Sequence, residues 1–249
     1  MIDFHSHVLA NIDDGSKSLE ESLAMLEEAY ESGTDVIVLT PHYYPRQEHT
    51  LAEFLEKRQS CYRELTEFCR GKKIPEIRLG CEVNLHTDIS RFEDVKKLCI
   101  EGTDYMLLEM PMDKWDDWIF DCIYNLTLKG IKPLMAHIDR YLDYPKEKLN
   151  SLFELDIAYQ VNSEAFLDFK YRVKMLELFY SGHLQVIGSD MHGIKKRKNT
   201  LASAYTELEN RFGERFISFV EDNGERILAN RRVKHHAHFP KVSKFKLLF

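Results

Sequence analysis

The sequence contains few cysteines, and their spacing fits none of the common cysteine-based sites. Cysteine occurs five times, an odd number, and the sequence has no Cys-x-x-Cys motif. This pattern argues against a disulfide framework or a zinc ribbon, and free thiols in a reducing compartment are the expected state. No cysteine is followed six residues later by an arginine, as in cysteine-dependent phosphatases. Any phosphatase activity of this chain must therefore use a different chemistry.

Long hydrophobic runs and an excess of positive charge are also missing. No apolar stretch reaches the length of a membrane span, and no basic region precedes an apolar one near the N-terminus, so we expect a cytoplasmic protein. The 34 lysines and arginines are outnumbered by 41 aspartates and glutamates, for a net charge of −7. This balance argues against a general binder of nucleic acids or anionic membranes. A hydrophobic fraction of 44% over 249 residues is ordinary for a globular enzyme.

Apolar segments of strand length alternate with segments of helical periodicity along the chain. Strands are predicted over residues 2–4, 35–40, 77–83, 105–108, 132–136, 157–161 and 185–188. Helices are predicted over residues 18–33, 51–70, 115–129, 146–155 and 170–180, with two more over 200–229. Seven strands that alternate with helices indicate a parallel α/β barrel or an open doubly wound sheet. We expect one domain over residues 1–230 and a basic C-terminal tail over 231–249.

Metal-binding residue types follow almost every predicted strand. His5 and His7 are two residues apart, so both imidazoles project from the same face of an extended backbone. In parallel barrels the carboxyl ends of the strands gather at one face, where functional residues lie. Each candidate alone could be a cap, a turn residue or a surface side chain, but their recurrence at one structural position predicts a metal site. The candidates are His5, His7, His42, Glu82, Glu109, His137, Asp190 and His192.

This set of candidates is too large for a single ion. Mixed histidine and carboxylate ligands suit two or three Mn²⁺, Fe²⁺ or Zn²⁺ ions joined by a bridging carboxylate. Such clusters make hydroxide available near neutral pH and bind phosphoryl oxygens. Arg140 and Arg197 follow two of the candidate strand ends, and a guanidinium beside a metal cluster can bind an anion in a bidentate manner. Either arginine could instead belong to a surface ion pair, but together with the metals they favour phosphate binding.

Several short motifs resemble those of the PHP (polymerase and histidinol phosphatase) superfamily of metal-dependent phosphoesterases. They are His5-Ser-His7, Thr40-Pro-His42, Met135-Ala-His137 and Ser189-Asp-Met-His192, with Gly80-Cys-Glu82 between them. More narrowly, the chain is similar to the manganese-dependent protein-tyrosine phosphatases encoded with bacterial capsule and exopolysaccharide genes. The segments that carry this narrower resemblance are the opening Met1-Ile-Asp-Phe-His5-Ser-His7, Ile12-Asp-Asp-Gly15, Ala136-His-Ile-Asp-Arg140 and Gly188-Ser-Asp-Met-His192. The resemblance extends from residue 1 to about residue 229.

The resemblance implies a single-domain, distorted (β/α)₇ TIM-like barrel that holds three metal ions, with Mn²⁺ expected and Fe or Zn as alternatives. By position, it assigns the first ion to His5, His7, Glu82 and Asp190. It assigns the second to Glu82, Glu109 and His137, and the third to Asp14, His42 and His192. Asp14 is included because of the resemblance alone. Arg140 and Arg197 match phosphate-contacting arginines, and His42 and Asp190 are expected to join them as catalytic residues.

The implied activity is metal-dependent hydrolysis of protein phosphotyrosine, by attack of a metal-bridging hydroxide. The implied partner is the phosphotyrosine-containing tail of a bacterial tyrosine kinase that controls capsule or exopolysaccharide synthesis. No nucleic-acid partner and no integral membrane segment are expected. The protein could be recruited to a membrane-bound kinase. A small-molecule phosphatase of the histidinol-phosphate type, a nuclease-like phosphoesterase and a non-catalytic regulator that binds the kinase tail remain alternatives. Residues 193–199 depart from the family pattern, which usually carries prolines after its arginine.

Overall fold

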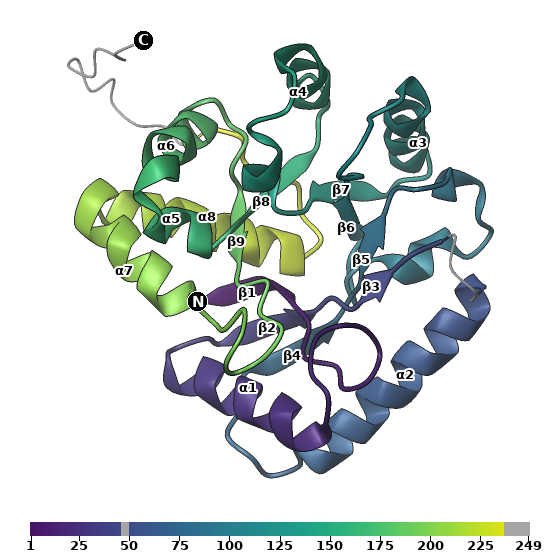
Figure 1. Cartoon of the computed structure of the whole chain (residues 1–249), viewed down its shortest axis with the longest axis vertical. Helices are drawn as coiled ribbons and strands as arrows, with labels where there is room; N and C mark the ends of the chain where they lie inside the picture. The colour runs from purple at the N-terminus through teal and green to yellow at the C-terminus, as the bar shows by residue number, and fades with distance from the viewer. Residues whose placement is uncertain (46–49, 237–249) are drawn as a thin grey trace.

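A curled parallel sheet forms the centre of the protein (Figure 1). The computed structural model describes residues 1–45 and 50–236, without the side chain of Arg172. Hydrogen bonds join the strands in two continuous segments of the sheet, in the orders β1-β2-β4 and β3-β5-β6-β7-β8-β9. Every strand pairing is parallel. The strands are β1 (Ile2–Ser6), β2 (Val36–Leu39), β3 (His42–Tyr43), β4 (Glu76–Leu79), β5 (Glu82–Asn84), β6 (Tyr105–Glu109), β7 (Lys132–Met135), β8 (Ala158–Asn162) and β9 (Val186–Gly188).

The second predicted strand is followed by a further short strand, and the third is interrupted once. β2 is continued by β3 after Pro41, and β4 is continued by β5 after Gly80 and Cys81. Pro41 has no N–H to donate to a ladder, which is why regular pairing stops there. These strands still run together, because the Glu82 amide donates to the Pro41 carbonyl at 3.1 Å. The sheet therefore has seven strand positions, as the sequence predicts.

The first and last strands close the sheet on itself. An isolated parallel bridge joins Ser6 to Met191, and the His7 amide donates to the Met191 carbonyl at 2.9 Å. The Asp190 amide donates to the His5 carbonyl at 2.7 Å. Closure brings the carboxyl ends of β1 and β9, which are far apart in the sequence, to adjacent positions. The predicted distorted α/β barrel is confirmed.

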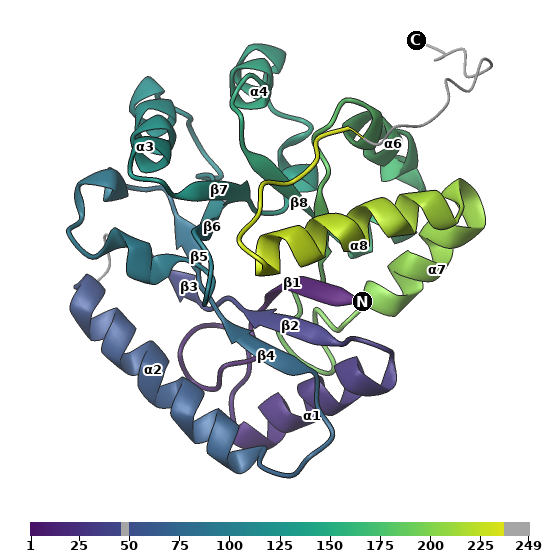
Figure 2. The same ribbon diagram turned by 180° about the vertical axis from the view of Figure 1, so that it is seen from behind.

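Helices cover the outside of the sheet (Figures 1 and 2). Three differences from the predicted helices are small: the helix predicted over 115–129 begins at Asp117, and a short helix and a 3-10 turn precede the helix that begins at Arg172. None of the helices in the described ranges is long and apolar enough to cross a membrane. The helices are α1 (Leu19–Glu31), α2 (Leu51–Phe68), α3 (Asp117–Leu128), α4 (Lys146–Phe153), α5 (Glu164–Leu167), α6 (Arg172–Tyr180), α7 (Leu201–Phe212) and α8 (Glu214–Leu228).

The hydrophobic core lies both inside the curled sheet and between the sheet and its helices. Inside, Phe4, Leu107 and Leu134 are fully buried with Val186 and Ile227. Burying one such side chain contributes about 1.5–3 kcal/mol. One larger core joins β5–β9 to α3, α4 and the helices that follow, and another joins β1, β2 and β4 to α1 and α2. These cores hold the strand ends in fixed positions, which a polynuclear site requires.

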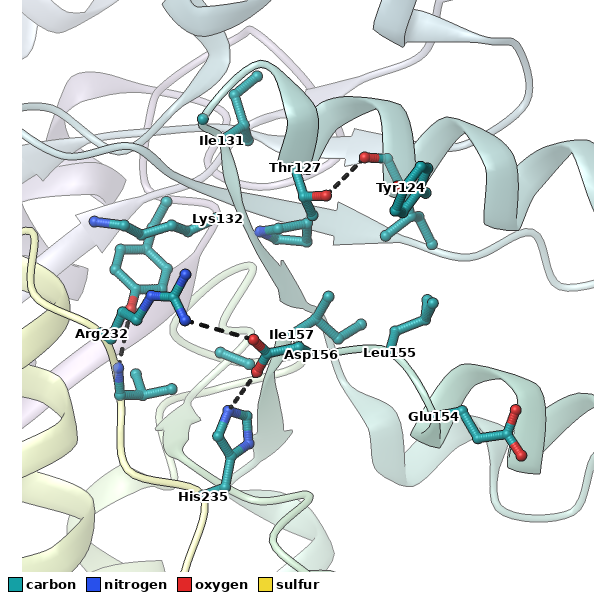
Figure 3. A pocket seen from close by; sticks show the side chains of 16 residues that line it. Tyr124, Thr127, Ile131, Lys132, Glu154, Leu155, Asp156, Ile157, Arg232 and His235 are labelled. Carbon is teal, nitrogen blue, oxygen red and sulfur yellow. Dashed lines mark hydrogen bonds and ion pairs between the residues drawn. The ribbon is translucent and has the colours of Figure 1, made fainter.

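The described part of the C-terminal tail packs against the opposite end of the barrel from the predicted site. The Tyr105 hydroxyl donates to the Arg231 carbonyl at 2.8 Å. A cavity of about 630 Å³ lies here, between the starts of β6, β7 and β8 (Figure 3). Within its lining, Asp156 contacts Arg232 at 3.7 Å and His235 at 3.3 Å. The domain boundary at residue 230 stays a prediction, and residues 237–249 lie outside the described part.

Candidate metal centre

The residues that follow the strands converge on one site at the carboxyl end of the barrel. His5 and His7 extend from β1, and their Nε2 atoms lie 3.1 Å apart. Glu82, at the start of β5, places Oε2 3.2 Å from His5 Nε2 and 3.4 Å from His7 Nε2. Asp190, after β9, places Oδ1 within 3.6 Å of both imidazoles. The four predicted ligands of the first ion are thus brought together.

The predicted ligands of the third ion also lie together. Asp14 Oδ1 lies 3.3 Å from His192 Nε2 and 3.5 Å from His42 Nε2. His7 joins this group, because ligand atoms of all four side chains lie within 4.8 Å of one another. Asp14 is the only exposed member, and it comes from the loop after β1. The structure therefore brings in a residue that only the family resemblance had pointed to.

The predicted ligands of the second ion form a third group, which is shared with His42. His137 Nε2 lies 2.7 Å from Glu82 Oε1 and 3.6 Å from Glu109 Oε1. His42 lies near the same two glutamates, because ligand atoms of His42, Glu82 and Glu109 lie within 4.8 Å of one another. Glu82 therefore borders all three imidazole-rich regions, as expected of a bridging carboxylate. Which ion each side chain holds stays a prediction.

The chemistry of the buried donor atoms fits a cationic cluster. Glu82 Oε2, Asp190 Oδ1 and His42 Nδ1 are buried, and none of them makes a well-aligned hydrogen bond to another residue of the described chain. Glu82 Oε2 instead faces three imidazole nitrogens at 2.9–3.4 Å. Buried polar atoms are normally hydrogen-bonded or metal-bound, because desolvation without a partner is costly. Nitrogen and carboxylate donors at these positions match the ligand preferences of Mn²⁺, Fe²⁺ and Zn²⁺.

The buried carboxylates of the centre are held in their ionised form. Burial raises the pKa of Glu82, but His5 and the other imidazoles around it outweigh burial and hold the pKa well below its usual range. The pKa of Asp190 is also held well below its usual range, because His5, His7 and Arg140 outweigh its burial. Two ionised carboxylates in a buried site favour a positive charge between them, from a protonated imidazole or from a metal ion.

The histidines differ according to the charges around them. Burial lowers the pKa of His7, but the neighbouring carboxylates, above all Asp13, raise it well above the usual value. The pKa of His137 rises to about 9, because contacts with two glutamates outweigh burial. Burial and the charge of His7 lower the pKa of His192 to about 4. His192, which contacts Arg197, is therefore held in its neutral form.

Asp13 is a site residue that the sequence analysis missed. Its Oδ2 lies 2.8 Å from His7 Nδ1 and accepts the backbone N–H of His42 at 3.0 Å. Its Oδ1 accepts the backbone N–H of Gly15 at 2.9 Å. A carboxylate on the outer nitrogen of a ligating histidine fixes the ring and directs its other nitrogen to the metal. The pair of aspartates in the turn just after two candidate ligands was the available signal.

β8, the strand that offers no metal ligand, connects ligands of the other strands. Gln160 Oε1 accepts the backbone N–H of His137 at 2.7 Å and lies 3.2 Å from His5 Nδ1. Its amide nitrogen donates to Asn162 Oδ1 at 2.9 Å. Asn162 in turn donates to Asp190 Oδ2 at 2.9 Å. Gln160 and Asn162 therefore fix the relative positions of three predicted ligands, a role that no local sequence signal revealed.

Arg140 and Arg197 lie on the open side of the centre. Both guanidinium groups contact Asp190 Oδ2, with Arg197 Nη2 at 2.7 Å. Arg197 Nη1 also lies 2.8 Å from His192 Nε2. Their side chains keep 35% and 40% of their surface exposed, so both can reach an incoming anion. Backbone strain is concentrated here as well, since His137, Asp190 and Arg197 have positive φ angles of 31°, 52° and 46°.

Comparison with known proteins identifies the family of this chain. The family model for capsular polysaccharide synthesis, CpsB/CapC, matches residues 1–229. The tyrosine-protein phosphatase CpsB of Streptococcus agalactiae serotype V is 30% identical over 248 residues, which cover 94% of this chain and 100% of the relative. The tyrosine-protein phosphatase YwqE of Bacillus subtilis strain 168 is 26% identical over 246 residues, which cover 94% and 93%.

Solved structures agree with the fold. Crystal structures of YwqE from Bacillus subtilis and CpsB from Streptococcus pneumoniae, described as unique metal-dependent tyrosine phosphatases, match with a TM-score of 0.78. The sequence identity is 24%, and the match covers 94% of this chain and 96% of the solved one. A TatD-like protein from Archaeoglobus fulgidus shares the fold at a TM-score of 0.52 and 13% identity, over 92% and 99% of the two chains. The predicted resemblance is confirmed: the chain belongs to the CpsB/CapC family of capsular polysaccharide synthesis, a family of capsular tyrosine phosphatases.

Proposed function

We propose that this protein hydrolyses phosphotyrosine on a protein substrate, using a cluster of divalent metal ions. The observation that carries the proposal is the convergence of histidines and carboxylates from six strand positions beside two half-exposed arginines. The family and the names of its relatives support the same activity. We assign the metal ligands as His5, His7, Asp14, His42, Glu82, Glu109, His137, Asp190 and His192.

Mn²⁺ is the proposed metal, with Fe²⁺ and Zn²⁺ as the competing ions, because the mixed nitrogen and oxygen donors accept all three. When bound, the ions supply a nucleophilic hydroxide near neutral pH and neutralise phosphoryl oxygens. His42 and Asp190 would take part as ligands that hold these ions beside the arginines. Asp13 and Gln160 keep the rings of His7 and His5 oriented.

Arg140 and Arg197 bind the phosphoryl group of the substrate. Both rest on Asp190 in this structure, and their exposure allows them to turn toward an anion. A guanidinium pairs with two phosphoryl oxygens at once, which orients the phosphorus for in-line attack. The leaving phenolate has a conjugate acid with a pKa of about 10, so it needs less help from a general acid than an alkoxide does. No acid is assigned for this reason.

The proposed substrate is a phosphotyrosine segment of a bacterial tyrosine kinase that controls capsule or exopolysaccharide synthesis. The membership in a family of capsular polysaccharide synthesis supports this choice. The competing substrates are small phosphomonoesters such as histidinol phosphate and nucleic acids, since the same metal chemistry serves all of them. The protein could also bind the kinase tail without turnover.

A single assay separates these functions. A phosphotyrosyl peptide, histidinol phosphate and an oligonucleotide are each incubated with the protein and Mn²⁺, with or without a chelator. We expect turnover of the phosphotyrosyl peptide but not of histidinol phosphate or the oligonucleotide. The chelator should abolish this turnover. His5→Ala and Asp190→Ala should abolish turnover, whereas His183→Ala, at the opposite end of the barrel, should retain it. Turnover that survives chelation would refute the metal mechanism, and peptide binding without turnover would favour the regulatory alternative.

A further inference from the structure

A basic loop borders the open side of the metal centre. Residues 194–198, here named the basic loop, have the sequence Ile-Lys-Lys-Arg-Lys, and all five are exposed. Arg197 contacts Asp190 and Asp14, but Lys195, Lys196 and Lys198 make no ion pair with any residue in the described ranges. Four adjacent positive charges in a chain of net charge −7 are therefore largely uncompensated within the protein.

The basic loop is anchored at the site. The His192 amide donates to the Arg197 carbonyl at 2.8 Å, which closes a tight loop with Arg197 at a φ of 46°. The side chain of Thr200, just after the loop, is hydrogen-bonded to Ser163 at 2.6 Å. Because consecutive Cα atoms are about 3.8 Å apart, Lys196 and Lys198 stand directly beside the arginine proposed to hold the phosphoryl group.

The neighbouring loop does not neutralise this charge. The loop after β1 runs beside the loop after β9 (Figure 1). Glu21, in α1, lies close to Gly193 and accepts the Lys17 amide at 2.8 Å, but within the described residues it makes no ion pair with a lysine of the basic loop. Asp14, which is 4.0 Å from Arg197, belongs to the predicted metal ligands. The lysines therefore face solvent next to Arg197, beside the metal centre.

We propose that the basic loop selects phosphotyrosine segments that carry further anionic groups next to the target residue. This inference rests on the proposed phosphotyrosine phosphatase function. An extended peptide advances about 3.3–3.6 Å per residue, so a carboxylate or a second phosphate one to three residues from the phosphotyrosine reaches the loop lysines. Exposed charge pairs are individually weak, but several acting together improve binding and speed association.

Binding of non-hydrolysable peptides tests the proposal independently of catalysis. Labelled peptides carry phosphonomethyl-phenylalanine in place of phosphotyrosine, flanked by alanines, glutamates or phosphoserines, and fluorescence anisotropy measures Kd on the Mn²⁺-loaded protein. We expect the wild type to bind the glutamate and phosphoserine peptides about fivefold more tightly than the alanine peptide. The preference should shrink to less than about twofold in 1 M salt, because screening is then nearly complete.

Two matched variants identify the residues responsible. Lys195→Ala/Lys196→Ala/Lys198→Ala removes three charges from the basic loop and should abolish the preference. The control Lys72→Ala/Lys73→Ala/Lys129→Ala removes three exposed charges from the opposite end of the barrel and should retain it.

Three outcomes would overturn the proposal. These are equal binding of the alanine and glutamate peptides by the wild type, an equal loss in both variants, and displacement of the glutamate peptide by an oligonucleotide of the same charge. A preference that depends on the basic loop, in a protein that fails to turn over any phosphotyrosyl peptide, would support the loop's role and refute the proposed activity instead.

Discussion

Replacing Gln160 with methionine should weaken metal binding as well as stability. The side chain is fully buried, and its Oε1 is the acceptor for the His137 amide at 2.7 Å and the neighbour of His5 Nδ1 at 3.2 Å. Methionine nearly preserves the volume, so little of the effect comes from a cavity. Leaving the buried His137 N–H without an acceptor costs about 1–3 kcal/mol of stability.

The metal-binding effect of Gln160→Met follows from the lost orientation of His5. Removing the partner of a ligating histidine reduces metal affinity by about 10- to 100-fold. This corresponds to about 1.4–2.8 kcal/mol. Urea unfolding of the chelated protein measures the loss of stability, and calorimetric titration with Mn²⁺ measures the loss of affinity.

Gln185→Met is a matched control for Gln160→Met. Gln185 is equally buried, accepts the Tyr159 amide at 2.8 Å and donates to the Gly182 carbonyl at 2.7 Å, but it lies at the other end of β9. It should lose a similar amount of stability and bind Mn²⁺ as the wild type does. Wild-type affinity in Gln160→Met, or an equal loss of affinity in both variants, would refute the positioning role of β8.

Two further predictions concern groups outside the metal centre. Thiol alkylation should leave activity unchanged, because burial raises the pKa of Cys81 to about 11 and of Cys99 to about 12. Mass spectrometry should show that half-buried Cys61 is alkylated first. Activity that is lost in step with Cys61 labelling would contradict this prediction. Burial and nearby His235 lower the pKa of His183 in the folded state, so the unfolded chain takes up more protons below the ordinary value of 6.5 and stability should fall as the pH drops below 6.5. In urea unfolding from pH 7.5 to 5, His183→Phe should show a smaller decrease than the wild type, and equal slopes would disprove the assignment.

The strand ends were the part of the site that the sequence predicted best. An apolar strand and the residue after it are adjacent in the chain, and parallel closure brings all carboxyl ends to one face. His5, Glu109 and His137 could therefore be assigned to one site from the sequence alone. Asp14 follows no strand directly, and the family resemblance was needed to include it.

The sequence could not predict where a strand breaks or which buried polar residues support the ligands. Gly80 and Cys81 interrupt a strand whose hydrophobic pattern is continuous, because pairing depends on the partner strand as well as on local composition. Asp13 and Gln160 looked like a turn residue and a strand residue. The role of Asp13 depends on its contact with His7. The role of Gln160 depends on contacts with His137 and His5, which lie 23 and 155 residues away in the sequence.

The sequence by itself determined the alternation of strands and helices and the metal-binding residue types at the strand ends, because hydrophobic periodicity and the position after a strand are local properties. The tertiary structure alone decided that Glu82 also contacts His42, that β8 connects the ligands, and that uncompensated lysines border the open side. These features depend on closure between β1 and β9 and on strand register. Both are set by packing between segments that are distant in the chain.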